Sequence, residues 1–339
     1  MRWAYVVAMA LGLYALYATI AFSVPLASVD SPMHVDIKRG MTFREATDVL
    51  VSHGLVRNPN IFVALARLTG VHTQIKPGRY VFTGDVSPWE VFTSLRDGRV
   101  TYAEFTVYEG DTLERIRERM VREELMSPAA FDRMAHDQAF LVSEGIHSPT
   151  LEGYLYPETY YIEFGLEPKD VVRPMLRRMR EAFDPYATRM SALRMSMNEV
   201  LTLASIVEKE AAVDEERAMI SAVYHNRLRK GMRLQADPTV IYGVKPLSEG
   251  ITRQDLSRET PYNTYRINGL PPGPIASPGQ QSIEAALYPS DAPYIFFVSN
   301  NDGTHTFTTT LTEHRRAVKS YRIKRLILGA KQAAVASGS

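Results

Sequence analysis

An apolar stripe at helical spacing constrains the second half of the chain more firmly than any other feature of the sequence. One helix face would carry, at positions i, i+3, i+7 and i+11, the residues Val200, Leu203, Val207 and Ala211. A helix advances about 100° per residue, so Glu210 falls roughly 50–60° from the middle of this stripe. We therefore predict a helix that carries Glu210 toward the protein interior, opened by a capping box at Ser196–Glu199.

The other charged residues of this segment fall on different faces. The same count places Glu208 roughly 110° from the stripe and Lys209 almost opposite it, so both are expected near solvent. An inward carboxyl without a cation on its own face is costly to ionise, and its pKa rises. Such a group suits a general acid, but a buried glutamate that braces a loop is more common. Periodicity alone leaves both roles open for Glu210.

Composition excludes several classes of function. The chain has 339 residues, of which 45% are hydrophobic and 23% charged, which leaves room for two or three domains. A net charge of +1 gives no reason to expect a nucleic-acid partner. Because there is no cysteine, disulfides, thiolate metal sites and cysteine nucleophiles are excluded. His305 and His314 lack the neighbours of a metal site, and we predict neither a metal nor a cofactor.

The N-terminal segment predicts a membrane anchor. Residues 3–22 carry no charge, and as a helix they would span about 30 Å, the thickness of a bilayer core. Arg2 precedes the segment and Asp30 is the first charge after it, so the positive-inside rule puts the N-terminus in the cytoplasm. A cleaved signal peptide is the alternative, because Ala21-Phe22-Ser23 resembles a cleavage site. Both interpretations export the rest of the chain, and a single-pass anchor in the cell inner membrane is favoured.

Turn signals and periodicity divide the rest of the chain into α+β segments. Residues 23–33 contain Pro25 and Pro32 and are expected to form a linker. Strands are predicted at residues 34–38 and 79–82, and helices at 43–50, 61–68 and 89–95. Further helices are predicted at residues 171–183, 216–228 and 312–328. The fold class is therefore α+β, with a helix-rich C-terminal part.

A strand, a turn and a helix start occur twice in the first half. The segment from Phe105 to Ile116 parallels the segment from Val35 to Phe43, with Thr112 and Thr42 in equivalent places. This pattern resembles the opening of the LysM sugar-binding module. An ordinary β-turn-α unit, in which these threonines cap the helices, is the alternative. Met41 stands where the LysM pattern has Asp, which weakens the expectation of sugar binding by the first copy.

Several loops in the second half combine aromatic rings with amides and carboxylates. Aromatic faces pack on sugar C–H groups, and amides and carboxylates hydrogen bond to hydroxyls, so this combination suits a carbohydrate groove. The candidate substrate-binding residues are Glu152, Tyr156, Glu158, Asn226, Gln235, Asp237, Tyr262, Asn263 and Tyr265. Taken singly, each stretch is more simply explained as loop scaffolding. A Ser205–Lys209 dyad at i, i+4 is disfavoured, because both residues would lie on the polar face.

Seven motifs in order resemble the endolytic murein transglycosylase (YceG-like) family. They are residues 151–160 (LEGYLYPETY), 204–210 (ASIVEKE), 225–228 (HNRL), 232–243 (MRLQADPTVIYG), 262–265 (YNTY), 269–275 (GLPPGPI) and 303–307 (GTHTF). The order and spacing agree over about residues 34–325. The resemblance implies an enzyme that cuts peptidoglycan glycan strands internally, with Glu210 as the catalytic residue. It also implies a lytic reaction that leaves 1,6-anhydromuramic ends and terminates nascent strands.

The resemblance also sets expectations about organisation and partners. The expected divisions are residues 1–22 as a transmembrane anchor, 23–33 as a linker, 34–103 as a LysM-like module, 104–150 as a second LysM-like segment and connection, 151–328 as a YceG-like catalytic domain and 329–339 as a disordered tail. The catalytic domain would be periplasmic, and wall-synthesis enzymes such as penicillin-binding proteins are candidate partners. A non-enzymatic peptidoglycan-binding scaffold is the alternative from another class. A cytosolic lyase conflicts with the export signal.

Overall fold

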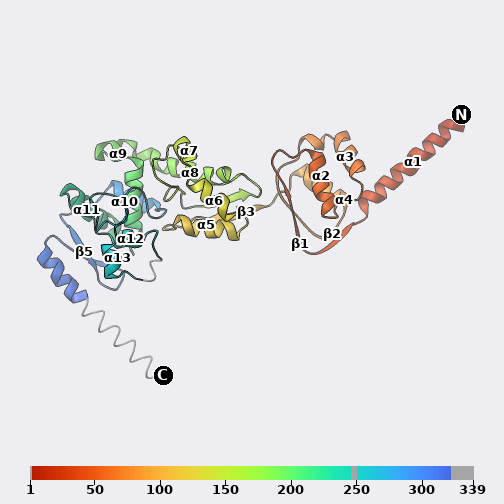
Figure 1. Cartoon of the computed structure of the whole chain (residues 1–339). Coiled ribbons are helices and arrows are strands. Elements are labelled where there is room, and N and C mark those ends of the chain that lie inside the picture. Colours follow the sequence, from red (N-terminus) through yellow and green to blue (C-terminus); the bar gives the residue numbers. More distant parts are fainter. Residues whose placement is uncertain (1, 246–249, 322–339) are drawn as a thin grey trace, which may run out of the picture. The chain divides into compact units, whose positions relative to one another are not determined.

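The computed structural model describes residues 2–245 and 250–321 (Figure 1). The chain divides into two compact units. Unit 1 comprises Met1–Phe105, Met120–Met126 and Tyr160–Val171, and unit 2 comprises Thr106–Arg119, Ser127–Thr159 and Val172–Ser339. Helices and three small two-stranded sheets make up the described residues, so the predicted α+β class is confirmed.

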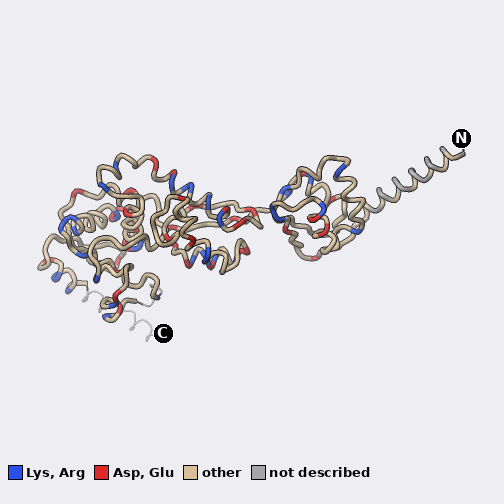
Figure 2. The backbone as a smooth tube through the Cα atoms, turned by 45° about the horizontal axis from the view of Figure 1, so that its top comes forward, with Lys and Arg blue, Asp and Glu red and all other residues tan. Residues whose placement is uncertain are grey.

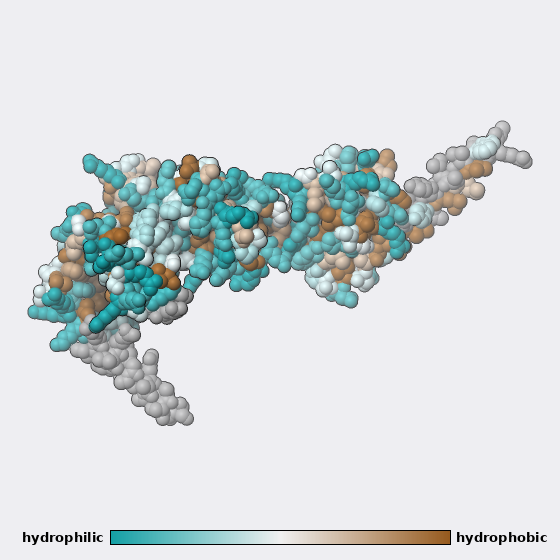
Figure 3. All heavy atoms as spheres, viewed as in Figure 1, coloured by the Kyte–Doolittle hydropathy of each residue, from teal (hydrophilic) through white to brown (hydrophobic). Residues whose placement is uncertain are grey.

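The N-terminal apolar segment forms helix α1 (Arg2–Ser23). Large apolar side chains on this helix, including Trp3, Met9 and Leu13, are exposed (Figure 3). In the part of the chain that the structure describes, no helix combines the length and the apolarity needed to cross a membrane. The prediction of a helix here is confirmed, whereas its membrane-spanning character is not.

The expected linker at residues 23–33 is wrong over most of its length, because strand β1 (Ala27–Ile37) begins there. β1 pairs antiparallel with β2 (Gly78–Val86), from Ala27 opposite Val86 to Ile37 opposite Gly78. Pro32 lies where the register shifts, between Val29 and Met33. Proline has no N–H for a ladder bond and is tolerated at such irregularities, so its presence did not prevent a strand.

Three helices pack on this sheet and close the core of unit 1. They are α2 (Phe43–Ser52), α3 (Pro59–Leu68) and α4 (Pro88–Asp97), with a short 3-10 helix, η1 (Val71–Thr73), after α3. Thr42 caps α2 in a capping box with Glu45, as its place before the helix predicted. The core includes Leu50, Phe62 and Phe92, which are at most 1% exposed. The predicted helices therefore form, each within a few residues of its expected ends.

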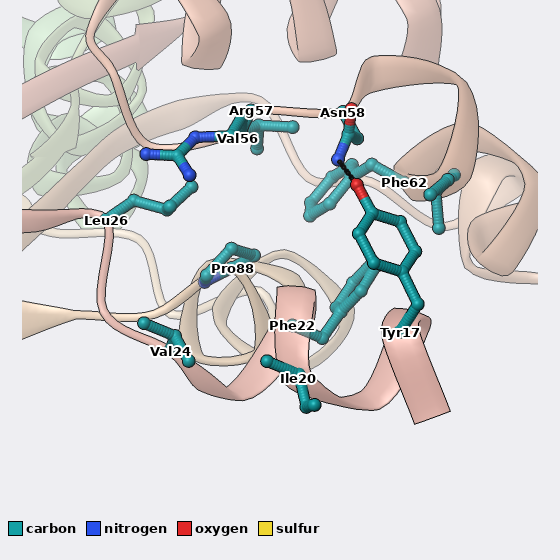
Figure 4. A pocket seen from close by; sticks show the side chains of 11 residues that line it. Tyr17, Ile20, Phe22, Val24, Leu26, Val56, Arg57, Asn58, Phe62 and Pro88 are labelled. Carbon is teal, nitrogen blue, oxygen red and sulfur yellow. Dashed lines mark hydrogen bonds between the residues drawn. The ribbon is translucent and has the colours of Figure 1, made fainter. Parts of the chain in front are cut away.

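The last turns of α1 lie against this core. Phe22 stacks on Phe62 with 6.0 Å between ring centroids, and the hydroxyl of Tyr17 accepts a hydrogen bond from the Asn58 amide at 3.2 Å (Figure 4). A cavity of about 200 Å³ lies between these residues and Pro88. α1 and the first helices are thus joined by direct contact.

Helices predominate in the remaining part of the chain, most of which belongs to unit 2. The elements from residue 102 onward are β3 (Tyr102–Thr106), α5 (Leu113–Arg122), α6 (Pro128–Ala135), α7 (Gln138–Ser143), β4 (Thr159–Glu163), α8 (Pro168–Phe183), η2 (Asp184–Tyr186), α9 (Ala187–Leu193), α10 (Met197–Glu210), η3 (Asp214–Glu216), α11 (Arg217–Arg229), α12 (Asp237–Ile241), α13 (Arg253–Ser257), α14 (Gln280–Leu287), β5 (Phe296–Ser299) and β6 (His305–Thr308). β3 pairs with β4, and β5 pairs antiparallel with β6.

The end of the chain is only partly described. A helix covers residues 311–321, which agrees with the start of the helix predicted at 312–328. The remainder of that helix and the predicted tail at 329–339 lie outside the described residues. Along the described backbone, basic and acidic residues are interspersed in both units (Figure 2). This mixture agrees with the net charge of +1.

Candidate active site

Helix α10 is the structural centre of the candidate site. It begins with the predicted capping box, in which Ser196 and Glu199 bond reciprocally. Every residue from Val200 to Val207 is buried, because α11, α12 and α14 all pack on α10. The helix therefore has no solvent face along this length, and the prediction of one apolar stripe facing one core was too simple.

Glu210 is the last residue of α10 and lies deep in unit 2, yet part of its surface stays accessible. Its Oε1 accepts a hydrogen bond from the Tyr224 hydroxyl at 3.2 Å, and Asp237 lies close enough for its charge to act on the carboxyl. Burial, followed by the negative charge of Asp237, raises the pKa of Glu210 to about 7. The negative end of the helix dipole acts in the same direction. Glu210 is thus poised to hold or release a proton near neutral pH.

Glu208 does not face solvent, which corrects the angular prediction. Its side chain is 8% exposed, and its Oε2 lies 3.2 Å from Nη1 of Arg217 and accepts a bond from the Gly279 amide at 3.0 Å. Lys209 is half-buried and donates to the carbonyl of Gly110 at 3.1 Å. The difference between the two glutamates therefore lies in their partners: Glu208 has a cation and Glu210 has a phenol.

Arg227 is the cation whose charge acts on Glu210, but its guanidinium bonds to backbone carbonyls. Arg227 is buried, and its charge lowers the pKa of Glu210 only as a minor effect. Its guanidinium donates to the carbonyls of Leu234 and Ile295 at 2.6 and 2.7 Å. Arg227 thus secures the loops around the site, and the Glu210 carboxyl keeps its raised pKa.

Two loops predicted from the sequence meet beside Glu210. The amide of Gln235 donates to the Thr264 carbonyl at 3.2 Å, and the amide of Ala236 donates to the Thr264 hydroxyl at 2.9 Å. The hydroxyl of Tyr265 then donates to Oδ1 of Asp237 at 2.7 Å. Gln235 and Asp237 are exposed, so their side chains are available to a substrate next to the Glu210 carboxyl.

Three candidate sugar-binding residues lie behind this surface. Asn226, Asn263 and Glu152 are 7%, 0% and 3% exposed. The Asn226 amide donates to the carbonyls of Ala292 and Tyr294, both at 2.8 Å. The Asn263 side chain donates to the Arg258 carbonyl at 2.7 Å and accepts from the Tyr265 amide at 3.0 Å. These buried side chains hold the loops through those contacts, and the prediction that they contact sugar stays a prediction.

Glu152 connects distant parts of unit 2. Its carboxylate accepts from the amide of Leu113 at 3.0 Å and from the hydroxyl of Tyr242 at 2.9 Å. Burial raises its pKa to about 7, although these donors oppose the shift. Tyr242 in turn packs on Tyr262 with ring centroids 4.6 Å apart. Glu152 therefore positions an aromatic pair, both members of which are partly exposed.

Tyr156 and Glu158 are placed by α8 and α14. The hydroxyl of Tyr156 bonds to Oε1 of Gln280 at 3.2 Å, and the guanidinium of Arg178 lies 5.7 Å from its ring centroid. Glu158 pairs with Arg178 at 2.7 Å, and both side chains are more than 40% exposed. The structure gives these two residues a shared partner rather than a place beside Glu210.

Sequence reasoning missed Tyr224 and Tyr242, the two phenols that contact the buried carboxyls. Tyr224 is separated from Glu210 by a turn between helices, and Tyr242 lies 90 residues from Glu152. A tyrosine inside the buried stripe of α11 was the available signal for Tyr224. The disfavoured Ser205–Lys209 dyad finds no support, because the fully buried Ser205 hydroxyl donates to Thr202 and accepts from Ile275.

Within residues 2–245 and 250–321, no three His, Asp or Glu side chains come close enough together to hold a metal ion. His305 lies 2.7 Å from Glu216, and it pairs there with that single carboxylate.

These features together define an α+β protein in which a buried central helix ends in a poorly solvated acid beside polar and aromatic loops. The chain belongs to the YceG-like family, whose model matches residues 35–320. A relative named endolytic murein transglycosylase, from Bacillus subtilis, is 29% identical over 306 residues and covers 85% of this chain and 84% of its own length.

A second relative and a solved structure are also similar to this chain. The endolytic murein transglycosylase of Streptococcus pneumoniae (strain D39) is 28% identical over 319 residues, and the chain spans 58% of its length. The crystal structure of a putative yceG-like protein from Listeria monocytogenes superposes with a TM-score of 0.59 at 31% identity. That match covers 85% of this chain and 99% of the other.

Proposed function

We propose that the protein is an endolytic peptidoglycan lytic transglycosylase with Glu210 as its acid and base. The observation that carries this proposal is the state of Glu210, a partly exposed residue whose carboxyl has a raised pKa and, among the described residues, bonds to the Tyr224 hydroxyl and forms no ion pair. A general acid must be protonated at the working pH, and a pKa of about 7 meets this need. The names of the relatives in the family supply the substrate class, murein.

The reaction balances with a single carboxyl. Protonated Glu210 gives its proton to the oxygen of the β-1,4 bond between N-acetylmuramic acid and N-acetylglucosamine, and the bond from that oxygen to C1 breaks. The C6 hydroxyl of the same muramic residue closes on C1, and its proton passes to the Glu210 carboxylate. A hydrolase would require a carboxylate to activate water or attack C1. Asp237, anionic and close by, favours the positive charge that develops at C1.

The products test this reaction. Glycan strands digested by the purified chain are expected to give fragments ending in 1,6-anhydromuramic acid, lighter by one water than reducing ends. Mass spectrometry distinguishes the two. Reducing muramic ends would show a hydrolase, and intact strands recovered bound to the chain would show a non-enzymatic scaffold.

The pH profile tests the environment of Glu210. Tyr224→Phe removes a donor that lowers the pKa of Glu210, whereas Asp237→Asn removes a charge that raises it. Activity requires the protonated acid and declines as pH rises through this pKa. The descending limb of kcat against pH is therefore expected to move up by roughly 0.5–1 unit in the first variant and down by a similar amount in the second. Shifts in the same direction would contradict the assignment.

We also propose that the catalytic part works outside the cytoplasm, where peptidoglycan lies. The uncharged segment at residues 3–22 supports export, either as a retained anchor or as a cleaved signal. Fractionation of cells that express a C-terminally tagged chain tests this, since a cytosolic pool alone would contradict it. On the resemblance alone, residues 34–103 are a candidate LysM-like sugar contact. Wall-synthesis enzymes such as penicillin-binding proteins are candidate partners on the same basis.

A further inference from the structure

An open cleft of about 520 Å³ lies next to the loops of the site. Its lining consists of Arg233, Glu259, Thr260, Pro261, Arg266 and Ile267. None of these residues has a part in the acid–base chemistry. Two arginines against one glutamate give the cleft a net positive charge, which favours an anionic ligand.

Tyr265 links this cleft to the reacting groups. Nη1 of Arg233 donates to the Tyr265 carbonyl at 2.9 Å, while the hydroxyl of the same tyrosine donates to Asp237 at 2.7 Å. The charges of Asp237 and Glu210 act on each other, and the charge of Glu210 also acts on the Tyr265 hydroxyl, so the three groups lie close together. The main chain of Tyr265 thus borders the cleft, and its ring ends beside the acid. A ligand that occupies the cleft would belong to the substrate held at Glu210.

Both arginines have capacity for a ligand. A guanidinium has five N–H donors, and the Tyr265 carbonyl takes one of those of Arg233. Arg266 pairs with Glu259 at 2.9 Å, but the side chains are 43% and 81% exposed, and pairs so exposed are weak. A carboxylate arriving with the substrate can therefore replace Glu259 as the partner of Arg266.

We propose that Arg233 and Arg266 bind a carboxylate of the stem peptide carried by the muramic residue of the substrate. This inference rests on the proposed function, since the stem peptide is attached through the lactyl group of that sugar. The N-acetylated sugar rings themselves bear no charge, and the lactyl carboxyl is held in the amide bond to the peptide, so the anionic groups of the native substrate lie on the stem peptide. The planar guanidinium matches a carboxylate with two parallel hydrogen bonds.

Three substrate pools test the proposal with the full-length chain. One pool has strands with native stem peptides, the second has the same strands with carboxylates converted to neutral methylamides, and the third has strands freed of peptide by an amidase. The wild type is expected to cleave the first pool with a kcat/KM about five- to tenfold above the other two, mainly through KM. Equal cleavage of all three would overturn the proposal. If the first and third pools were cleaved with equal kcat/KM, and both faster than the methylamide pool, the cleft would bind the lactyl carboxylate. That result would overturn the peptide assignment.

The proposed role predicts that Arg266→Gln and Glu259→Gln change kcat/KM on the first pool in opposite directions. A merely structural role of these residues would not give this result. Arg266→Gln is expected to remove the preference for the first pool over the methylamide pool. Arg233→Lys keeps the charge but loses the planar pair of donors, so it is expected to retain only part of that preference. Glu259→Gln removes the competing carboxylate and is expected to raise kcat/KM on the first pool. Arg177→Gln, which breaks a similarly exposed pair with Glu181 on α8, is the matched control with no effect.

The two levels of the proposal fail differently. If the proposed function is wrong, the wild type releases no anhydro-ended product from any pool. If only the role of the cleft is wrong, the wild type releases that product, and Arg266→Gln lowers cleavage of the native and methylamide pools by the same factor.

Discussion

Glu210→Gln is expected to lower kcat by about 10²–10⁴-fold, the usual contribution of a positioned general acid, while glycan binding persists. The amide has nearly the shape of the carboxyl and can still accept from Tyr224, but it has no proton to give to the leaving oxygen. Release of 1,6-anhydro-ended fragments, measured by mass spectrometry under single-turnover conditions, is the readout. Full anhydro product from this variant would refute the assignment.

The same variant has a stability signature that supports the interpretation. The pKa of Glu210 is raised from 4.5 to about 7 in the folded protein. The stability linked to this carboxyl is thus fully present below pH 4.5 and is lost as pH rises through about 7. At pH 8 the glutamine variant should therefore melt no lower than the wild type. Glu215→Gln, at an exposed position, is the control expected to keep full activity.

Gly153→Ala is expected to lower the free energy of unfolding by roughly 3 kcal/mol or more. Gly153 has a φ of +76°, and a Cβ there would lie 2.3 Å from Cβ of Pro274 and 3.0 Å from the carbonyl oxygen of Ala276. Neither neighbour is the end of a flexible side chain, so backbone must move. Urea denaturation followed by residual activity measures the change, because the transition that matters is that of unit 2.

Gly145→Ala is the matched control for this prediction. Gly145 also has a left-handed φ, +70°, but a Cβ there meets nothing within 4 Å. Its cost should be limited to backbone strain, about 1–2 kcal/mol. Equal losses in the two variants would show that the clash with Pro274 is absorbed, and that residues 151–154 are packed less tightly against residues 274–276 than the distances indicate.

Local signals in the sequence predicted local structure well. Ser196 caps its helix as its spacing to Glu199 indicated, and Thr42 caps α2 as the alternative to the LysM interpretation expected, because both partners of a capping box lie within one turn. Strand β1 was predicted too short, because its pairing with β2 overrides the proline signal at Pro32. Sequence propensity describes a segment alone, whereas a strand is stabilised by a partner about 50 residues away.

In the candidate site, too, the sequence predicted local features better than contacts between segments far apart in the chain. Periodicity and the family motifs both selected Glu210, but the physical reason offered for its difference from Glu208 was wrong. Both side chains are drawn into the protein because α10 is covered on every side, and only the position of Arg217 separates them. That position, like the contact of Tyr242 with Glu152, depends on how helices far apart in sequence meet, which a single-helix projection does not contain.

The burial of residues 200–207 of α10 has a consequence for how the protein loses activity. This part of the helix is covered on every face and cannot open independently, so the amides of residues 200–207 should exchange hydrogen only when unit 2 opens as a whole. The acid at its end therefore shares the lifetime of the entire unit. Heat inactivation should coincide with cooperative melting of unit 2, and activity should serve as a direct measure of its integrity.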